Sequence, residues 1–155
     1  MTQVIAHRGA SGHRPEHSRA AYELAVELGA DAIEPDLVPT KDGLLVLRHE
    51  NEVSGTTDVA ERPEFAHLRT TKTIDGQTVT GWFTEDMTWD EVRTLTVRER
   101  LPALRPASAA HDGEGHVLRL DDLLGVLDAA PRPVGLVAEV KHATFFEQAG
   151  FPMAE

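Results

Sequence analysis

The sequence has no cysteine, few aromatic residues and no long apolar run. Disulfides and thiolate metal sites are therefore excluded, and no segment approaches the roughly 20 apolar residues of a membrane-spanning helix. The N-terminal residues show no signal-peptide pattern. We therefore expect the chain as written to be cytoplasmic, without stable membrane insertion. A leader further upstream would instead place it in the periplasm or outside the cell.

Positive charge is also scarce. The 15 Lys and Arg residues are outnumbered by 26 Asp and Glu residues, which gives a net charge of −11. A field of this sign repels nucleic acids and anionic membrane surfaces, so neither is expected as a partner. A small phosphate-bearing substrate would need local compensation from a bound cation or from Arg and Lys side chains at its site.

The remaining composition is that of one globular domain, with 155 residues of which 41% are hydrophobic. Residues 4–6 form an apolar run that predicts a short buried strand. Ser18 can cap a helix that Gly29 ends. Its apolar positions recur at helical spacing and are Ala21, Leu24, Ala25 and Leu28. Strand, helix and a following strand predict the βαβ unit of an α/β domain.

Residues 32–38 predict the second strand and residues 44–47 the third, with turn residues at 39–43 between them. So short a connection holds no crossover helix, and it therefore predicts an antiparallel hairpin. A turn centred in that stretch sets Glu34 opposite His49.

The segment from about 51 to 115 has no sustained period and is expected to be an insertion or lid region. Within it, Asp75 and Gly76 predict the tip of a small hairpin, and Thr88 with Glu91 makes a capping box.

Two regular elements are expected after this segment. A helix is predicted from residue 121 or 122 to residue 127. Residues 134–140 predict a strand with Glu139 and Lys141 on one face, because side chains alternate along a strand.

Three carboxylates fall on these strands. Glu34 and Asp36 stand at i and i+2, so both point to one side, where they repel each other unless a cation or a proton lies between them. Glu139 can supply a third oxygen ligand. Such a set favours a hard divalent cation, Ca2+ or Mg2+, over zinc. The alternative is that the pair begins a solvated edge strand.

His7 and His49 each end an apolar run. Phosphodiester cleavage needs one group that accepts a proton from the attacking oxygen and one that donates a proton to the leaving oxygen, and imidazole does both at neutral pH. Arg8 and Lys141 supply fixed positive charge for phosphate oxygens. Each residue alone is more often an ordinary core or surface residue. Together, beside the carboxylates, they predict acid–base chemistry on phosphate.

Six motifs carry these residues in order: His7-Arg8-Gly9-Ala10, Pro15-Glu16, Glu34-x-Asp36, Lys41-Asp42-Gly43, Arg48-His49-Glu50 and Glu139-x-Lys141. With Ser54–Val59 and Gly81–Thr84, which match an insertion in one branch, the set resembles the glycerophosphodiester phosphodiesterase family. The resemblance implies a (β/α)8 barrel that hydrolyses glycerophosphodiesters to an alcohol and sn-glycerol 3-phosphate with one divalent cation. It also implies a role for each residue already named: His7 and His49 as the catalytic acid–base pair, Glu34, Asp36 and Glu139 as metal ligands, and Arg8 and Lys141 as phosphate ligands.

Three positions depart from the family pattern. His17 stands where Asn usually follows Pro-Glu, which calls into question the polar contact made there. Glu50 replaces the more frequent Asp, and Pro35 separates the two acids. Neither of these two is expected to alter the chemistry.

A (β/α)8 barrel takes roughly 250 residues. We therefore expect residues 1–155 to be a partial domain, the N-terminal half of the barrel, in which the C-terminal half is missing. An open half barrel has an unpaired edge and an exposed apolar face, so we expect it to aggregate, dimerise or bind the dye ANS.

Three other functions stay open at this point. One is a phospholipase D-like lipid phosphodiesterase on a similar barrel. Another is a glycosidase with Glu34 and Glu139 as its carboxylate pair, which leaves the two histidines without a role. The third is a fragment that binds a cation or is inactive.

Overall fold

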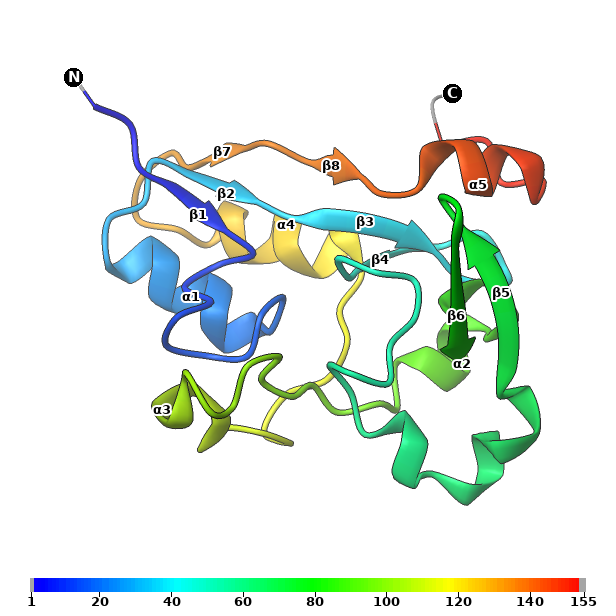
Figure 1. Ribbon diagram of the computed structural model, residues 1–155. Helices are drawn as coiled ribbons and strands as arrows, with labels where there is room; N and C mark the ends of the chain where they lie inside the picture. Colours follow the sequence, from blue (N-terminus) through cyan, green and yellow to red (C-terminus); the bar gives the residue numbers. More distant parts are fainter. Residues whose placement is uncertain (1, 154–155) are drawn as a thin grey trace.

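The computed structural model describes residues 2–153. Three parallel strands form the first sheet, in the order β1 (Ile5–His7), β2 (Ala32–Glu34) and β7 (Gly135–Leu136). The helix between β1 and β2 makes this the predicted βαβ unit, and its α/β class is confirmed (Figure 1).

A second sheet continues directly from the first. Strand β3 (Asp36–Pro39) pairs antiparallel with β4 (Leu45–Leu47) and parallel with β8 (Glu139–Val140). The predicted hairpin is therefore present. Leu37 faces Leu47, which is one residue away from the register that pairs Glu34 with His49. Residues 2–153 form open sheets and no closed barrel.

The two longer strands predicted from the sequence are each divided into two short ones, and this part of the prediction was wrong. Pro35 lies at the break between β2 and β3 and has no N–H to donate. Its carbonyl still accepts, because Glu139 N donates to Pro35 O at 2.9 Å and Lys141 N donates to Leu37 O at 3.1 Å. The backbone ladder therefore holds β8 in register with β3 across the break.

Helices α1 (Arg19–Glu27) and α4 (Leu120–Asp128) cover one side of the first sheet (Figure 1). The predicted cap of α1 is confirmed, since Ser18 Oγ accepts from Ala21 N at 3.1 Å. Leu28 was expected on the buried stripe but is 65% exposed, because the helix ends before it. The core between these helices and the sheet consists of Tyr22, Ala25, Ala30, Ile33, Leu37, Leu47, Leu118, Leu123 and Val126.

Helix α4 begins earlier than predicted. Asp122 does not open the helix but lies in its first turn, where its carboxylate accepts from Arg119 N at 2.9 Å. The acidic side chain thus caps the helix from within, as in a capping box.

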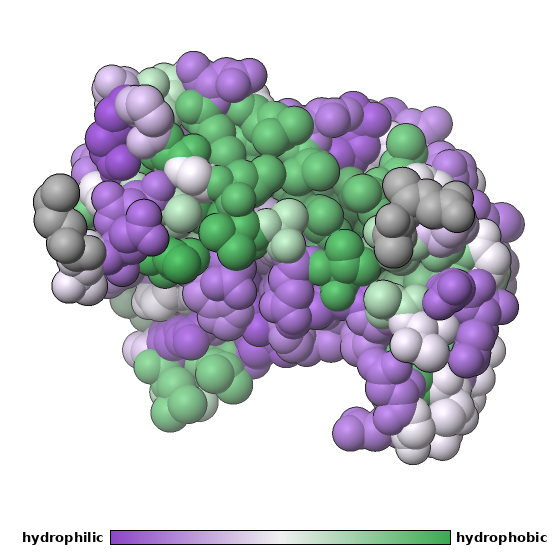
Figure 2. Space-filling model, turned by 90° about the horizontal axis from the view of Figure 1, so that it is seen from above, coloured by the Kyte–Doolittle hydropathy of each residue, from purple (hydrophilic) through white to green (hydrophobic). Residues whose placement is uncertain are grey.

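Strand β1 was expected to be buried, and it is not. Val4 is 57% exposed and Ile5 is 46% exposed, because β1 pairs only with β2 and its other edge is uncovered in residues 2–153. Figure 2 shows apolar side chains gathered on the face seen from above, where β7 and β8 run. The exposed apolar residues of these strands and the segments beside them are Val4, Ile5, Leu136, Val137 and Val140.

Residues 51–115 fold into short elements around a second core. They comprise the 3-10 turns η1 (Val59–Glu61), η2 (Pro63–Leu68) and η3 (Thr84–Asp86), the strands β5 (Thr70–Ile74) and β6 (Gln77–Gly81), and the helices α2 (Trp89–Val92) and α3 (Pro106–Ala109). The hairpin with Asp75 and Gly76 at its tip is confirmed, as is the capping box of Thr88 and Glu91.

The last helix, α5 (Ala143–Gln148), closes this second core through Phe146, which is fully buried there. Its partners in the cluster are Val38, Val46, Val53, Val59, Phe65, Met87, Val92, Leu95, Val97 and Val117. No helix formed by residues 2–153 combines the length and the apolar character needed to cross a bilayer.

Candidate active site

The strand register brings four of the predicted residues to one side of the sheets. In the parallel pairs, His7 lies beside Glu34 and Asp36 lies beside Glu139. Residues that are neighbours in register on adjacent strands point to the same side, as do residues at i and i+2 on one strand. Residues remote in the sequence therefore meet where the strands end.

A tight turn after β1 directs Arg8 into this region. Arg8 N donates to Glu34 O at 2.8 Å, and both Arg8 and Gly9 have left-handed φ values of 63° and 82°. A Cβ on Gly9 would lie 2.8 Å from the backbone carbon of Ala21, so only glycine fits against α1 here. The chain therefore turns sharply and presents the Arg8 side chain beside Asp36.

Asp36 is the buried centre of the site. Its Oδ2 atom lies 3.1 Å from Arg8 Nε and 3.1 Å from His17 Nε2, and its Oδ1 atom lies 3.4 Å from Lys141 Nζ. Burial raises the pKa of Asp36, but the hydrogen bond with His17 and the charges around it outweigh burial and hold this pKa well below its usual range. Asp36 is therefore ionised.

His17, which stands where the family pattern has Asn, makes two polar contacts, with Tyr22 and with Asp36. Burial lowers the pKa of His17 to about 4, so the ring is neutral at pH 7. Its Nε2–H can then donate to Asp36, while its Nδ1 accepts from the hydroxyl of Tyr22 at 2.6 Å. His17, itself held by Tyr22, thus fixes the orientation of the Asp36 carboxylate.

Lys141 was predicted to hold phosphate, and it also joins two of the carboxylates. Its ammonium nitrogen lies 2.7 Å from Glu139 Oε1 and 3.4 Å from Asp36 Oδ1. One positive charge therefore lies between the two acids, as their mutual repulsion requires.

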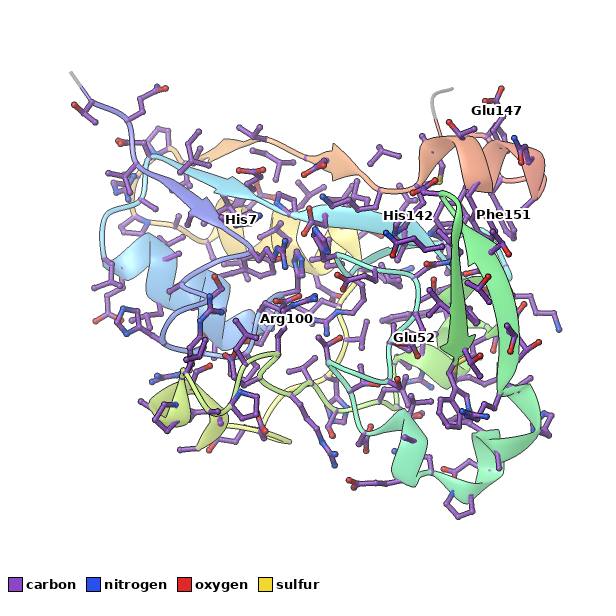
Figure 3. The ribbon with its side chains drawn as sticks, viewed as in Figure 1. His7, Glu52, Arg100, His142, Glu147 and Phe151 are labelled. Atoms are coloured by element: carbon purple, nitrogen blue, oxygen red, sulfur yellow. The ribbon has the colours of Figure 1, made fainter. Side chains whose placement is uncertain are left out.

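Sequence reasoning missed the cation that organises the opposite side of the site. Arg100 Nε and Nη2 donate to Glu16 at 2.9 and 2.7 Å, and Nη1 and Nη2 donate to Glu50 at 2.8 and 2.5 Å. Arg100 belongs to the segment 51–115 and lies below His7 in Figure 3. The available signal was Glu16 itself, because a buried carboxylate requires a partner of opposite charge.

Glu16 is 3% exposed and is bound by two arginines. Burial raises the pKa of Glu16, but the hydrogen bonds from Arg100 and the charge of Arg48 outweigh it, and the pKa is about 2. Arg48 is itself buried and donates to the carbonyl of Glu16 at 2.7 Å. Glu16 thus ties the loop after β1 to the end of β4.

The two histidines lie at opposite ends of this charge network. His7 Nε2 lies 3.3 Å from Arg8 Nε, and His49 Nδ1 lies 2.5 Å from Glu50 Oε1. Burial raises the pKa of Glu50, but hydrogen bonds from Arg100 and His49 outweigh it and leave the pKa below its usual value. Arg8, Glu16, Arg100 and Glu50 therefore link the two imidazoles through successive ion pairs.

The three predicted metal ligands, Glu34, Asp36 and Glu139, lie at the ends of adjacent strands. No three His, Asp or Glu side chains among residues 2–153 are close enough together to hold an ion as they stand. Asp36 Oδ1 is nevertheless buried without a hydrogen-bond partner, and Glu139 stands beside it in register. With Glu34 two residues away, the donors are all oxygens, which suits Ca2+ or Mg2+. The chemical type of these donor atoms therefore fits a hard divalent cation.

A cavity of about 390 Å3 lies next to the site, between the β5–β6 hairpin and the loop after His49. Its lining includes Glu50, Glu52, Asp75, Arg100 and His142, and Figure 3 shows three of these around it. His142 Nδ1 lies 2.6 Å from Asp75 Oδ2, so the hairpin tip is held against the residue that follows Lys141.

Comparisons with known proteins identify the family of this chain. Residues 7–148 match the model of the glycerophosphoryl diester phosphodiesterase family. A glycerophosphodiester phosphodiesterase of Arabidopsis thaliana is 38% identical over 144 residues, which are 93% of this chain and 38% of the relative. The crystal structure of a glycerophosphodiester phosphodiesterase from Agrobacterium tumefaciens has a TM-score of 0.63 at 26% identity, covering 97% of this chain and 55% of that one.

A phosphodiesterase of Oleispira antarctica, solved in complex with the product sn-glycerol-3-phosphate, has a TM-score of 0.62 at 24% identity, covering 91% of this chain and 45% of that one. The chain therefore spans 38% to 55% of the length of these proteins. The structural likenesses indicate an α/β fold of the TIM-barrel type.

Proposed function

The chain belongs to the glycerophosphoryl diester phosphodiesterase family, and from this premise we propose that it hydrolyses glycerophosphodiesters to an alcohol and sn-glycerol 3-phosphate. The observation that carries the proposal is the pairing of His7 with Glu34 and of Asp36 with Glu139 on adjacent strands. This register gathers imidazole, carboxylate and cationic groups on one side of the sheets. The product bound to the Oleispira phosphodiesterase supports the same substrate class.

The proposed reaction moves two protons. A P–O bond forms from the attacking oxygen, the P–O bond to the alcohol breaks, one imidazole accepts the proton of the attacking oxygen, and the other donates a proton to the leaving oxygen. We assign this pair to His7 and His49. Arg8 and Lys141 hold the phosphate oxygens in the proposal. Both lie within 3.4 Å of Asp36, and Arg8 Nε also lies 3.3 Å from His7 Nε2.

We propose that Glu34, Asp36 and Glu139 hold one divalent cation, Ca2+ or Mg2+. When bound, such an ion polarises phosphoryl oxygens and stabilises the negative charge that develops on them. The buried Oδ1 atom of Asp36 supports this assignment, because among residues 2–153 it has no hydrogen-bond partner and its charge is met only by Lys141 Nζ at 3.4 Å. Lys141 moves from Asp36 toward the phosphate in this scheme.

The cavity beside Glu50 is proposed to receive the alcohol group of the substrate. It opens between residues that directly follow His49 and Lys141, so an alcohol leaving the phosphorus enters it. Its lining is mixed, with Ile74 and Val79 beside the charged side chains, and it therefore suits a small polar alcohol.

Release of sn-glycerol 3-phosphate from glycerophosphocholine tests the proposal. EDTA is expected to abolish turnover, and added Ca2+ or Mg2+ to restore it. His7→Ala and His49→Ala are each expected to lower kcat by at least ~100-fold. His67→Ala is the matched control, because His67 is exposed in η2, and it is expected to leave kcat unchanged. Turnover that survives chelation would remove the metal assignment, and a normal rate in either variant would remove that histidine.

The alternatives are separated by the same assay. Hydrolysis of a lysolipid or sphingolipid, with no sn-glycerol 3-phosphate released from glycerophosphocholine, would indicate the phospholipase D-like reaction, which the family match and the named relatives do not favour. Cation binding without any turnover would indicate the non-catalytic function. A glycosidase leaves His7, His49 and Lys141 without a role, although Lys141 contacts Asp36 and Glu139 and His7 pairs in register with Glu34.

We also propose that the chain corresponds to the N-terminal half of a (β/α)8 barrel, with residues 51–115 inserted after strand β4. The shares of 38% and 55% covered in two relatives support this proposal. The uncovered outer edge of β1 supports it too, since a barrel strand has a neighbour on each side.

A further inference from the structure

Arg100 comes from the segment 51–115, far in sequence from every motif of the proposed site, yet it contacts two of the motif residues. Its guanidinium binds the carboxylates of Glu16 and Glu50 at once, each through two hydrogen bonds. Only the planar fork of arginine can grip two carboxylates in this way. The hydrogen bond with Glu16 raises the pKa of Arg100 above its usual value, so its charge is permanent.

The contact with Glu50 determines which nitrogen of His49 carries a proton. Glu50 is ionised and has no hydrogen to donate, so the bond between Glu50 Oε1 and His49 Nδ1 needs a proton on Nδ1. A neutral His49 is then left with a bare Nε2 atom. This atom can accept a proton from a substrate or water, and after accepting it can donate the proton again.

We propose that Arg100 is a positioning residue, which holds the Glu50 carboxylate so that His49 keeps its proton on Nδ1 and presents Nε2 for proton transfer. The inference rests on the proposed function for what His49 does, and on the contacts alone for how His49 is held. It gives the segment 51–115 a part in the reaction through a single side chain.

The geometry explains why glutamate suits position 50. One of its oxygens, Oε1, serves both His49 Nδ1 and Arg100 Nη1, while Oε2 binds Arg100 Nη2. The carboxylate must therefore reach two partners that approach from different elements. Without Arg100 the carboxylate is free to rotate, since Glu50 is partly exposed and the remaining bond to His49 fixes only one oxygen.

Two variants and one matched control test the proposal. Glu50→Ala removes the acceptor of the Nδ1 proton and leaves the pair of Arg100 with Glu16 intact. Arg100→Gln removes the guanidinium group that binds Glu16 and Glu50. Arg98→Gln is the control, because Arg98 makes the same kind of two-bond pair with Glu61 at 2.6 and 2.6 Å, two residues away and outside the site.

The first measurement is the tautomer of His49, read from the imidazole 15N shifts at a pH where the ring is neutral, with the His49 signals identified by their loss in His49→Ala. The Nδ1–H tautomer is expected to dominate in the wild type and in Arg98→Gln. Its population is expected to fall in Glu50→Ala and in Arg100→Gln. An unchanged population in Glu50→Ala overturns the proposal even if Arg100→Gln fails to fold.

The second measurement is turnover of glycerophosphocholine. Arg100→Gln and Glu50→Ala are expected to lower kcat by about 10-fold or more while KM stays within about 2-fold, since the substrate is still bound but its proton partner is misdirected. Normal kcat in both variants overturns the inference. Absence of turnover in the wild type refutes the proposed function, while the tautomer measurement still decides whether Arg100 and Glu50 hold His49.

Discussion

The strongest prediction of stability concerns Glu16. Its carboxylate is 3% exposed and is bound by Arg100 and Arg8, with the buried Arg48 nearby. Replacing it with glutamine keeps the shape and removes the charge. We expect Glu16→Gln to lose the part of the stability that depends on this charge, and therefore part of the pH dependence of unfolding.

The magnitude follows from the pKa. Glu16 has a pKa of about 2 in the folded chain, against 4.5 for an unperturbed glutamate. Because the folded pKa is the lower one, the unfolded chain binds more protons between these values, so stability is present above pH 4.5 and is lost as pH falls toward 2. The shift corresponds to about 3 kcal/mol at pH 7, of which about half remains near pH 3.3.

The assay is urea unfolding of the wild type and of Glu16→Gln from pH 7 to pH 2.5. The difference between their free energies of unfolding is expected to shrink by about 2 kcal/mol over this range. Glu61→Gln is the matched control, because Glu61 pairs with Arg98 through the same fork but is 65% exposed, where solvent screens the pair. Parallel curves for the wild type and Glu16→Gln would refute the reasoning.

Three further predictions concern the core and the exposed face. Tyr22→Phe removes the hydroxyl that donates to buried His17 Nδ1, and it is expected to lower the free energy of unfolding by about 1–3 kcal/mol in urea titrations. An unchanged urea midpoint would contradict this hydrogen bond. Leu123→Ala is expected to lower the free energy of unfolding by about 2–5 kcal/mol, because Leu123 is fully buried between α4 and the sheet. Leu124→Ala, at an exposed neighbouring position, is expected to lower it much less. The exposed apolar side chains along β1, β7 and β8 are expected to bind ANS or to drive dimerisation, and a monomer with a sharp melt and no ANS fluorescence would contradict this.

Local sequence signals predicted several elements well because their causes are local. Ser18 caps α1, Asp75 and Gly76 turn the β5–β6 hairpin, and Thr88 with Glu91 forms a capping box, as expected. Each of these features depends on side chains within a few residues of each other. The βαβ order and the hairpin after residue 39 were predicted for the same reason.

Features that depend on distant partners were predicted less well. The apolar run of β1 suggested burial, but Ile5 is exposed because burial of an edge depends on what lies beside it. The sequence predicted one continuous strand through Pro35, although a proline has no N–H to donate to a neighbouring strand. His17 was taken as a departure of uncertain effect, and only the fold shows that it contacts both Tyr22 and Asp36.

The sequence by itself determined the α/β class, the family and the chemical types gathered at the strand ends, because these follow from short patterns and motif order. The tertiary structure alone showed that Lys141 lies between Asp36 and Glu139 and that Arg100 joins Glu16 to Glu50. The physical reason is that a buried charge requires a partner of opposite sign, but nothing local in the sequence says which of many arginines and lysines the fold will bring to it.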